Sequence, residues 1–211
     1  MTNMVYPKTF MWLFVGLAIT FLTGFYVSIN SNMLYNVVNN WYILILIEFG
    51  IVIYLGARIT KMKYVTAMIS YLLYSFVTGL TFAAIFVVFA ISSIINIFAV
   101  AAVLFLIFAA IGYFAKIDLT KWGSMLLMAL IGLIIMILVN LFLNNSTFDL
   151  VISCVGVLIF VIYTAYDIQK IKQLEEYIDE DKLPIYGAFQ LYLDFINIFI
   201  YLLRIFGKAR D

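Results

Sequence analysis

A tract of 52 residues, 64–115, contains no charged residue and constrains the fold more than any other feature of the chain. A helix that crosses the hydrocarbon core of a bilayer needs only about 20 residues. The tract is therefore too long for one crossing and long enough for two. The rest of the chain has the same character, since 67% of its 211 residues are hydrophobic and only 11% are charged. These proportions are typical of a protein that crosses the membrane several times.

Apolar runs divide the chain into seven predicted membrane-spanning helices. The charge-free tract is split around the segment "AISSIIN", residues 90–96. The predicted spans are 9–29, 41–57, 64–90, 91–115, 122–143, 149–171 and 184–205. We therefore expect an all-α integral membrane protein in which residues 1–211 form a single seven-span domain.

Lysine and arginine occur in alternate loops, and short loops rich in these residues tend to stay in the cytoplasm. The first span is preceded by Lys8, and no lysine or arginine lies between the first two spans. Later positive residues follow the second, fourth and sixth spans: Arg58, Lys61, Lys63, Lys116, Lys121, Lys170, Lys172 and Lys182. This alternation predicts a cytoplasmic N-terminus, and seven crossings then place the C-terminus outside. Nine lysines against three arginines, with frequent Ile, Asn, Phe and Tyr, favour a bacterial plasma membrane.

Several classes of function are excluded by composition. The chain has no histidine, which excludes histidine-assisted nucleophilic catalysis and histidine-ligated haem. The only lysine within the bounds of a predicted span is Lys170, at the cytoplasmic end of 149–171, so a retinal Schiff base has no attachment point in the interior of a span. The net charge of +1 provides no basic field for nucleic acid. We expect no enzymatic activity and no bound cofactor. The lipid bilayer is a partner of the chain, and the sequence identifies no protein partner.

Three acidic residues remain inside the apolar runs: Glu48, Asp167 and Asp194. A charge at the centre of a bilayer costs about 2.5–3.5 kcal/mol on insertion scales. Such residues therefore face the interior of a helix bundle, form pairs, or mark a path for ions or protons. A purely structural role, joining helices by polar contacts, is the alternative.

The last predicted span carries polar residues along one helical face. Their spacing is 3, 4, 3, 4 and 3 residues, and they are Gly187, Gln190, Asp194, Asn197, Tyr201 and Arg204. We call this set the polar stripe. A polar stripe across a membrane needs water, ions or hydrogen-bond partners, which favours an ion or proton path.

Asp167 and Asp194 lie on consecutive spans joined by a short polar loop, so the two carboxyl groups are able to meet. Two carboxylates in contact in a dry site share one proton, and this arrangement would respond to pH without any histidine. Arg58 lies at the cytoplasmic end of its span, at a depth comparable to that of Asp167. We therefore predict an Arg58–Asp167 ion pair that acts as a latch.

The same acids suit two other classes of protein. A proton-coupled transporter would use them to carry protons. The segments "AYD" at 165–167 and "LYLD" at 191–194 partly resemble intramembrane aspartyl proteases. Those proteases carry Gly-x-Gly-Asp in the second of these helices and a Pro-Ala-Leu motif, and this chain has neither.

Two longer segments, "YTAYDIQKI" at 163–171 and "LYLDFINIFIYLLRIF" at 191–206, resemble the C-terminal signature of the transmembrane Bax inhibitor motif family. The similarity is greatest to its bacterial YetJ-type members. The resemblance implies two three-helix layers around a central C-terminal helix. It also implies a pH-sensitive calcium leak, with Asp167 and Asp194 as a hydrogen-bonded sensor and Arg58 latched onto Asp167.

On this interpretation calcium ions and protons are the partners of the protein, and calcium is the permeant ion. Glu48 and Asp194 would bind calcium transiently through carboxylate oxygens, which suit a hard cation. Gln190, Asn197 and Tyr201 would line the rest of the path along the polar stripe.

Overall fold

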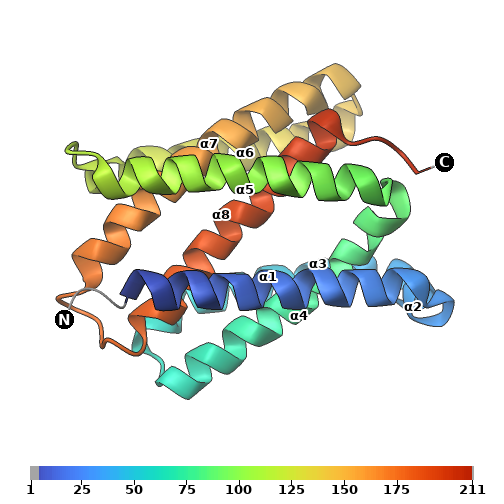
Figure 1. The fold of residues 1–211 in the computed structure, drawn as a ribbon. Coiled ribbons are helices and arrows are strands. Elements are labelled where there is room, and N and C mark those ends of the chain that lie inside the picture. Colours follow the sequence, from blue (N-terminus) through green and yellow to red (C-terminus); the bar gives the residue numbers. More distant parts are fainter. Residues whose placement is uncertain (1–4, 211) are drawn as a thin grey trace. The chain divides into compact units, whose positions relative to one another are not determined.

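The computed structural model describes residues 5–210 and is helical almost throughout (Figure 1). No β-strand forms within that range, where a single isolated bridge joins Phe89 to Ala209. The helices are α1 (Val5–Ile29), α2 (Ser31–Asn39), α3 (Trp41–Arg58), α4 (Tyr64–Val88), α5 (Ile91–Phe114), α6 (Gly123–Leu143), α7 (Ser146–Leu174) and α8 (Leu183–Phe206). One 3₁₀ turn, η1 (Ile59–Lys61), follows α3, and another, η2 (Leu119–Trp122), precedes α6.

Seven of the described helices are long and apolar enough to cross a bilayer, namely α1 and α3 to α8. The prediction of an all-α membrane protein with seven spans is therefore confirmed. The expected arrangement in two layers around the last helix stays a prediction, as does the single domain 1–211, which extends beyond the described residues at both ends.

The sequence analysis missed α2, a nine-residue helix that is too short to cross the membrane. Its start is fixed by Asn30, whose side-chain oxygen accepts a hydrogen bond of 3.2 Å from the backbone N–H of Met33. This capping arrangement satisfies a backbone donor that the first turn of a helix leaves without a partner. A cap followed by a mixed polar and apolar segment was the available signal for this helix.

Asparagine residues set the start of α7 and the end of α6. The α7 helix begins at Ser146, upstream of the predicted start at 149, because Asn145 accepts a 3.0 Å hydrogen bond from the backbone N–H of Phe148. The α6 helix ends where Asn144 adopts a left-handed conformation, with φ of 46°. Asparagine tolerates that conformation better than most residues, so it ends the helix at little cost.

The chain forms two compact units, and α8 contributes to both. The first unit comprises residues 5–91, 174–192 and 209–210, and the second comprises 92–173 and 193–208. The chain passes from the first unit to the second within α8, between Tyr192 and Leu193. Of the seven spans, α8 has the largest buried share, 61% of its 18-residue apolar window, against 11% for α6.

Close packing of α1 against α4 organises the first unit, and small residues make it possible. A Cβ atom on Gly24 would lie 3.1 Å from both the carbonyl oxygen of Gly79 and the Cβ of Phe82. A Cβ on Gly79 would lie 2.6 Å from the Cβ of Thr23. Small residues at such contacts let two helix backbones approach within a membrane, where van der Waals contact drives association.

The second unit is held by α5, α7 and the last part of α8. A Cβ on Gly112 of α5 would overlap the backbone of Ala165 on α7, so these two helices touch at their main chains. Phe195 of α8 packs edge-to-face against Phe98 and Phe105 of α5, with ring centroids 5.1 and 5.6 Å apart. These contacts fix the two helices that carry Asp167 and Asp194.

Candidate functional site

The second unit brings Asp167 of α7 and Asp194 of α8 into hydrogen-bonding contact. Each residue is only 3% exposed. The side chain of Thr164, on the same helix as Asp167, also contacts Asp194. An ionised carboxylate has no hydrogen to donate, so a hydrogen bond between two carboxyl groups requires a proton on one of them. The arrangement is that of two buried carboxyl groups from neighbouring helices in contact.

The helix that carries Asp167 is fixed to the loop between α5 and η2 by Gln169. The side-chain oxygen of Gln169 accepts a 2.8 Å hydrogen bond from the backbone N–H of Leu119, and its nitrogen donates to the carbonyl oxygen of Ile117 at 2.9 Å. A Cβ on Gly123 would lie 2.8 Å from the hydroxyl oxygen of Tyr166. The sequence analysis missed Gln169, although it lies two residues after Asp167 in the quoted motif.

Members of the polar stripe in the second unit are already engaged in contacts. The side-chain nitrogen of Asn197 donates to the carbonyl oxygen of Leu193, one turn earlier in the same helix, at 2.7 Å. The ring of Tyr201 fills the space over Gly156, where a Cβ would lie 2.6 Å from the ring. Arg204 forms an ion pair with Asp149 of α7 at 3.5 Å. Sequence reasoning missed this pair, although Asp149 opens the predicted span.

Glu48 lies on α3 in the first unit, and hydroxyl groups of α4 surround it. Thr78 donates a hydrogen bond of 2.8 Å to one carboxylate oxygen, and Thr81 donates one of 3.2 Å to the other. Sequence reasoning did not identify these partners. Their spacing of three residues in an otherwise apolar run was the available signal, since residues three apart lie on one helix face.

The hydroxyl groups continue from Glu48 into the core of the first unit, through Thr78 to Tyr192 of α8 and Thr20 of α1. The hydroxyl oxygens of Tyr192 and Thr20 are 2.5 Å apart. The single hydrogen of the Thr20 hydroxyl is directed to carbonyl oxygens, that of Ser75 at 2.9 Å and that of Gly16 at 3.1 Å. Tyr192 is therefore the donor to Thr20. We call Glu48, Thr78, Tyr192 and Thr20 the hydroxyl chain.

The remaining predicted contacts would join residues of different units. Arg58 is an exposed residue of the first unit and Asp167 belongs to the second, so the latch stays a prediction. The same holds for a continuous path from Glu48 to Asp194. Within residues 5–210 no group of three or more His, Cys, Asp or Glu side chains converges to hold a metal ion.

Comparison with known proteins identifies the family. The sequence profile described as "Inhibitor of apoptosis-promoting Bax1" (Bax1-I) matches residues 2–211, which is nearly the whole chain. The chain belongs to the Bax inhibitor family. The resemblance of the two C-terminal segments is thereby confirmed over the full length, including the spans whose apolar sequence carried no motif.

Bacterial members of the Bax inhibitor family are similar along most of their length. An uncharacterized protein of Borreliella burgdorferi is 36% identical over 217 aligned residues, which cover 99% of this chain and 94% of the relative. Inner membrane protein YbhL of Escherichia coli is 38% identical over 208 residues, covering 94% and 89%. An uncharacterized protein of Deinococcus radiodurans is 34% identical, covering 97% and 90%. The protein is thus an integral membrane protein of this family.

Proposed function

We propose that the protein is a calcium-permeable leak whose flux depends on pH, located in a bacterial plasma membrane with its N-terminus in the cytoplasm. The observation that carries the proposal is the buried contact between Asp167 and Asp194. The membership of the Bax inhibitor family and the location of YbhL in an inner membrane support it. We propose passive permeation and no enzymatic reaction.

The acid pair would act as the pH sensor. Two negative charges in a dry site repel each other strongly, so the pair holds one proton while the carboxyl groups touch. Removal of that proton as the pH rises leaves two buried charges, which favours separation of α7 from the last part of α8. An Arg58–Asp167 latch would add a second contact that depends on the charge of Asp167.

Calcium would be attracted by Glu48 and Asp194, with Gln190, Asn197 and Tyr201 along the path. Carboxylate and amide oxygens are the ligands that calcium prefers. A site with few ligands suits permeation, because an ion that binds weakly leaves readily. Protonation at low pH loosens the latch but also neutralises the carboxylates that attract the ion. The two effects act on flux in opposite directions.

A proton-coupled transporter is the second candidate, and the hydroxyl chain favours it. The hydroxyl contacts connect Glu48 with Tyr192, and hydroxyl groups both donate and accept hydrogen bonds. In that case calcium flux would be absent, and a pH gradient would drive uptake of another solute.

The test is calcium entry into proteoliposomes at a series of pH values from about pH 5 to pH 8. Wild-type protein is compared with Asp167→Asn and Asp194→Asn, and with Glu176→Gln as a control at an exposed loop acid. We expect pH-dependent flux in the wild type and the control, and loss of that dependence in both aspartate variants. Flux no greater than in empty liposomes would reject the calcium leak. Unchanged pH profiles in both aspartate variants would reject the sensor.

A further inference from the structure

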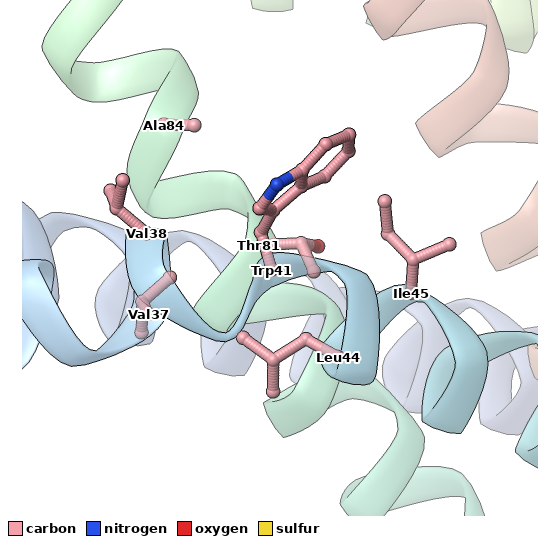
Figure 2. Close-up of a pocket in the computed structure, with 7 residues that line it drawn as sticks. All are labelled: Val37, Val38, Trp41, Leu44, Ile45, Thr81 and Ala84. Carbon is pink, nitrogen blue, oxygen red and sulfur yellow. The ribbon is translucent and has the colours of Figure 1, made fainter.

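A half-open groove in the first unit lies between α2, α3 and α4 and has a volume of about 440 Å³. Figure 2 shows the side chains that line it: Val37 and Val38 of α2, Trp41, Leu44 and Ile45 of α3, and Thr81 and Ala84 of α4. Only the indole N–H and the threonine hydroxyl interrupt a hydrocarbon lining. Pockets for small molecules commonly have volumes of about 300–1,000 Å³ and a similar apolar lining with a few polar groups.

The carboxyl group of Glu48 is linked to the groove through one lining residue, Thr81. Trp41, Ile45 and Glu48 follow each other at spacings of four and three residues, so they lie along one face of α3. Thr81 connects the groove to the acid directly, because it lines the groove and donates to a carboxylate oxygen of Glu48 at 3.2 Å. Each oxygen of Glu48 therefore has a hydroxyl neighbour, Thr78 at 2.8 Å and Thr81 at 3.2 Å.

The carboxylate has hydroxyl partners but no cationic side chain beside it. None of the ion pairs formed within residues 5–210 involves Glu48. A carboxylate in a membrane span is costly unless a positive charge accompanies it. The groove therefore offers an apolar volume, and the carboxyl group of Glu48 lies directly behind Thr81, one of its lining residues.

The position of the groove along α3 indicates how a ligand would reach it. Trp41 begins the helix, and its ring lies against that of Tyr42, with centroids 4.0 Å apart. Aromatic residues at the end of a span are typical of the interface between membrane and water. Glu48 is seven residues further along, which corresponds to about 10 Å at 1.5 Å per residue. A ligand would enter from the interface and place its charge about 10 Å deeper.

We propose that this groove binds a hydrophobic organic monocation, an ammonium group on an apolar body of one or two rings. The ammonium would pair with Glu48 and donate hydrogen bonds to it, while the body would lie between Trp41 and the aliphatic side chains of α2 and α3. Such a ligand satisfies the charge of the acid and the apolar surface of the groove together. A strongly hydrated metal ion satisfies only the first. The proposal does not depend on calcium permeation.

The test measures fluorescence quenching of Trp41 in phosphatidylcholine proteoliposomes that contain no calcium. The chain has three tryptophans, so the double variant Trp12→Phe, Trp122→Phe leaves Trp41 as the reporter. The probes are 4-bromobenzylammonium and its neutral analogue 4-bromobenzyl alcohol, since bromine quenches tryptophan only at short range. We expect saturable quenching by the ammonium at a concentration about tenfold or more below that needed for the alcohol, which corresponds to about 1.4 kcal/mol.

Three further variants, each made in the Trp12→Phe, Trp122→Phe protein, show which residues cause the quenching. Glu48→Gln keeps the shape of the side chain and removes its charge, so the ammonium should lose its advantage while the alcohol still quenches. Ala84→Phe fills the groove and should abolish saturable quenching by both probes. Glu176→Gln, at an exposed loop acid, should leave both titrations unchanged.

Either of two results would overturn the proposal. Quenching that is linear and equal for both probes would show partition into the bilayer and no site. An ammonium advantage that persists in Glu48→Gln would show that this carboxylate does not recognise the charge. Calcium flux is absent from the readout, so failure of the leak hypothesis and failure of the cation site are observed separately.

Discussion

Removal of the Tyr192 hydroxyl by Tyr192→Phe should lower the free energy of unfolding by a measurable amount. This side chain is fully buried, and its hydroxyl contacts those of Thr20, at 2.5 Å, and Thr78. A hydrogen bond typically contributes about 0.5–1.5 kcal/mol net, and contacts between membrane helices average about 0.6 kcal/mol. Because the only hydrogen of the Tyr192 hydroxyl is donated to Thr20, one hydrogen bond is lost, with an expected cost of about 0.5–1.5 kcal/mol.

The ring contacts of Tyr192 should survive the substitution, which keeps the effect specific to the hydroxyl. Its ring packs edge-to-face against those of Tyr71 and Tyr74, with centroids 5.8 Å apart in each case. Phenylalanine preserves these contacts and adds no volume. Tyr177→Phe is the matched control, because Tyr177 lies in the loop after α7 and is 77% exposed. We expect the control to change stability by less than about 0.5 kcal/mol.

Thermal unfolding in detergent micelles, followed by tryptophan fluorescence and by loss of the monodisperse size-exclusion peak, measures the effect. A shift of about 2–4 °C per kcal/mol is expected for a chain of this length. A double-mutant cycle with Thr20→Val should give a coupling of about 0.5–1.5 kcal/mol, because both changes remove the same hydrogen bond. If Tyr192→Phe is as stable as the wild type, or if the two changes are strictly additive, the hydrogen bond between Tyr192 and Thr20 is refuted.

Two further predictions concern the second unit. Gly112→Leu should prevent the approach of α5 to the backbone of Ala165 and abolish folding. Gly132→Leu is the control and should be tolerated, because nothing lies within 4 Å of a Cβ added there. Size-exclusion chromatography distinguishes the two outcomes, and a monodisperse Gly112→Leu protein would contradict the packing. The Thr120 hydroxyl donates to Asp118 before η2 and holds the pKa of Asp118 below its ordinary value. A group whose pKa is lower in the folded state stabilises the protein above its unfolded pKa, so this stabilisation should fade as the pH falls below about 4. In Asp118→Asn the melting temperature should therefore depend less on pH in that range. Identical pH profiles of the melting temperature in wild type and variant would contradict this prediction.

The candidate site could be predicted from the sequence only in part. Acids in apolar runs are conspicuous, because burial of a charge in a membrane is costly, and Asp194 and Glu48 were recognised on that ground. The uncharged residues that form hydrogen bonds near these acids are not recognisable in the same way. Threonine and tyrosine are ordinary residues of a membrane span, so nothing in the local sequence distinguishes Thr78 or Tyr192 from a packing residue. Their role became visible only when α1, α3, α4 and α8 were placed together.

The sequence by itself determined that the chain has seven segments long and apolar enough to cross a membrane and which of them carry charge. Hydrophobic length and the cost of a buried charge are properties of single segments, so they can be read without knowledge of neighbours. Only the tertiary structure decided that Asp167 meets Asp194, that Glu48 is held by Thr78 and Thr81, and that Thr81 also lines a groove. Contacts between helices depend on rotation and on close approach at small residues such as Gly112. Many sequences with the same hydropathy would pack differently, because van der Waals fit rather than hydrophobicity drives helix association within a bilayer.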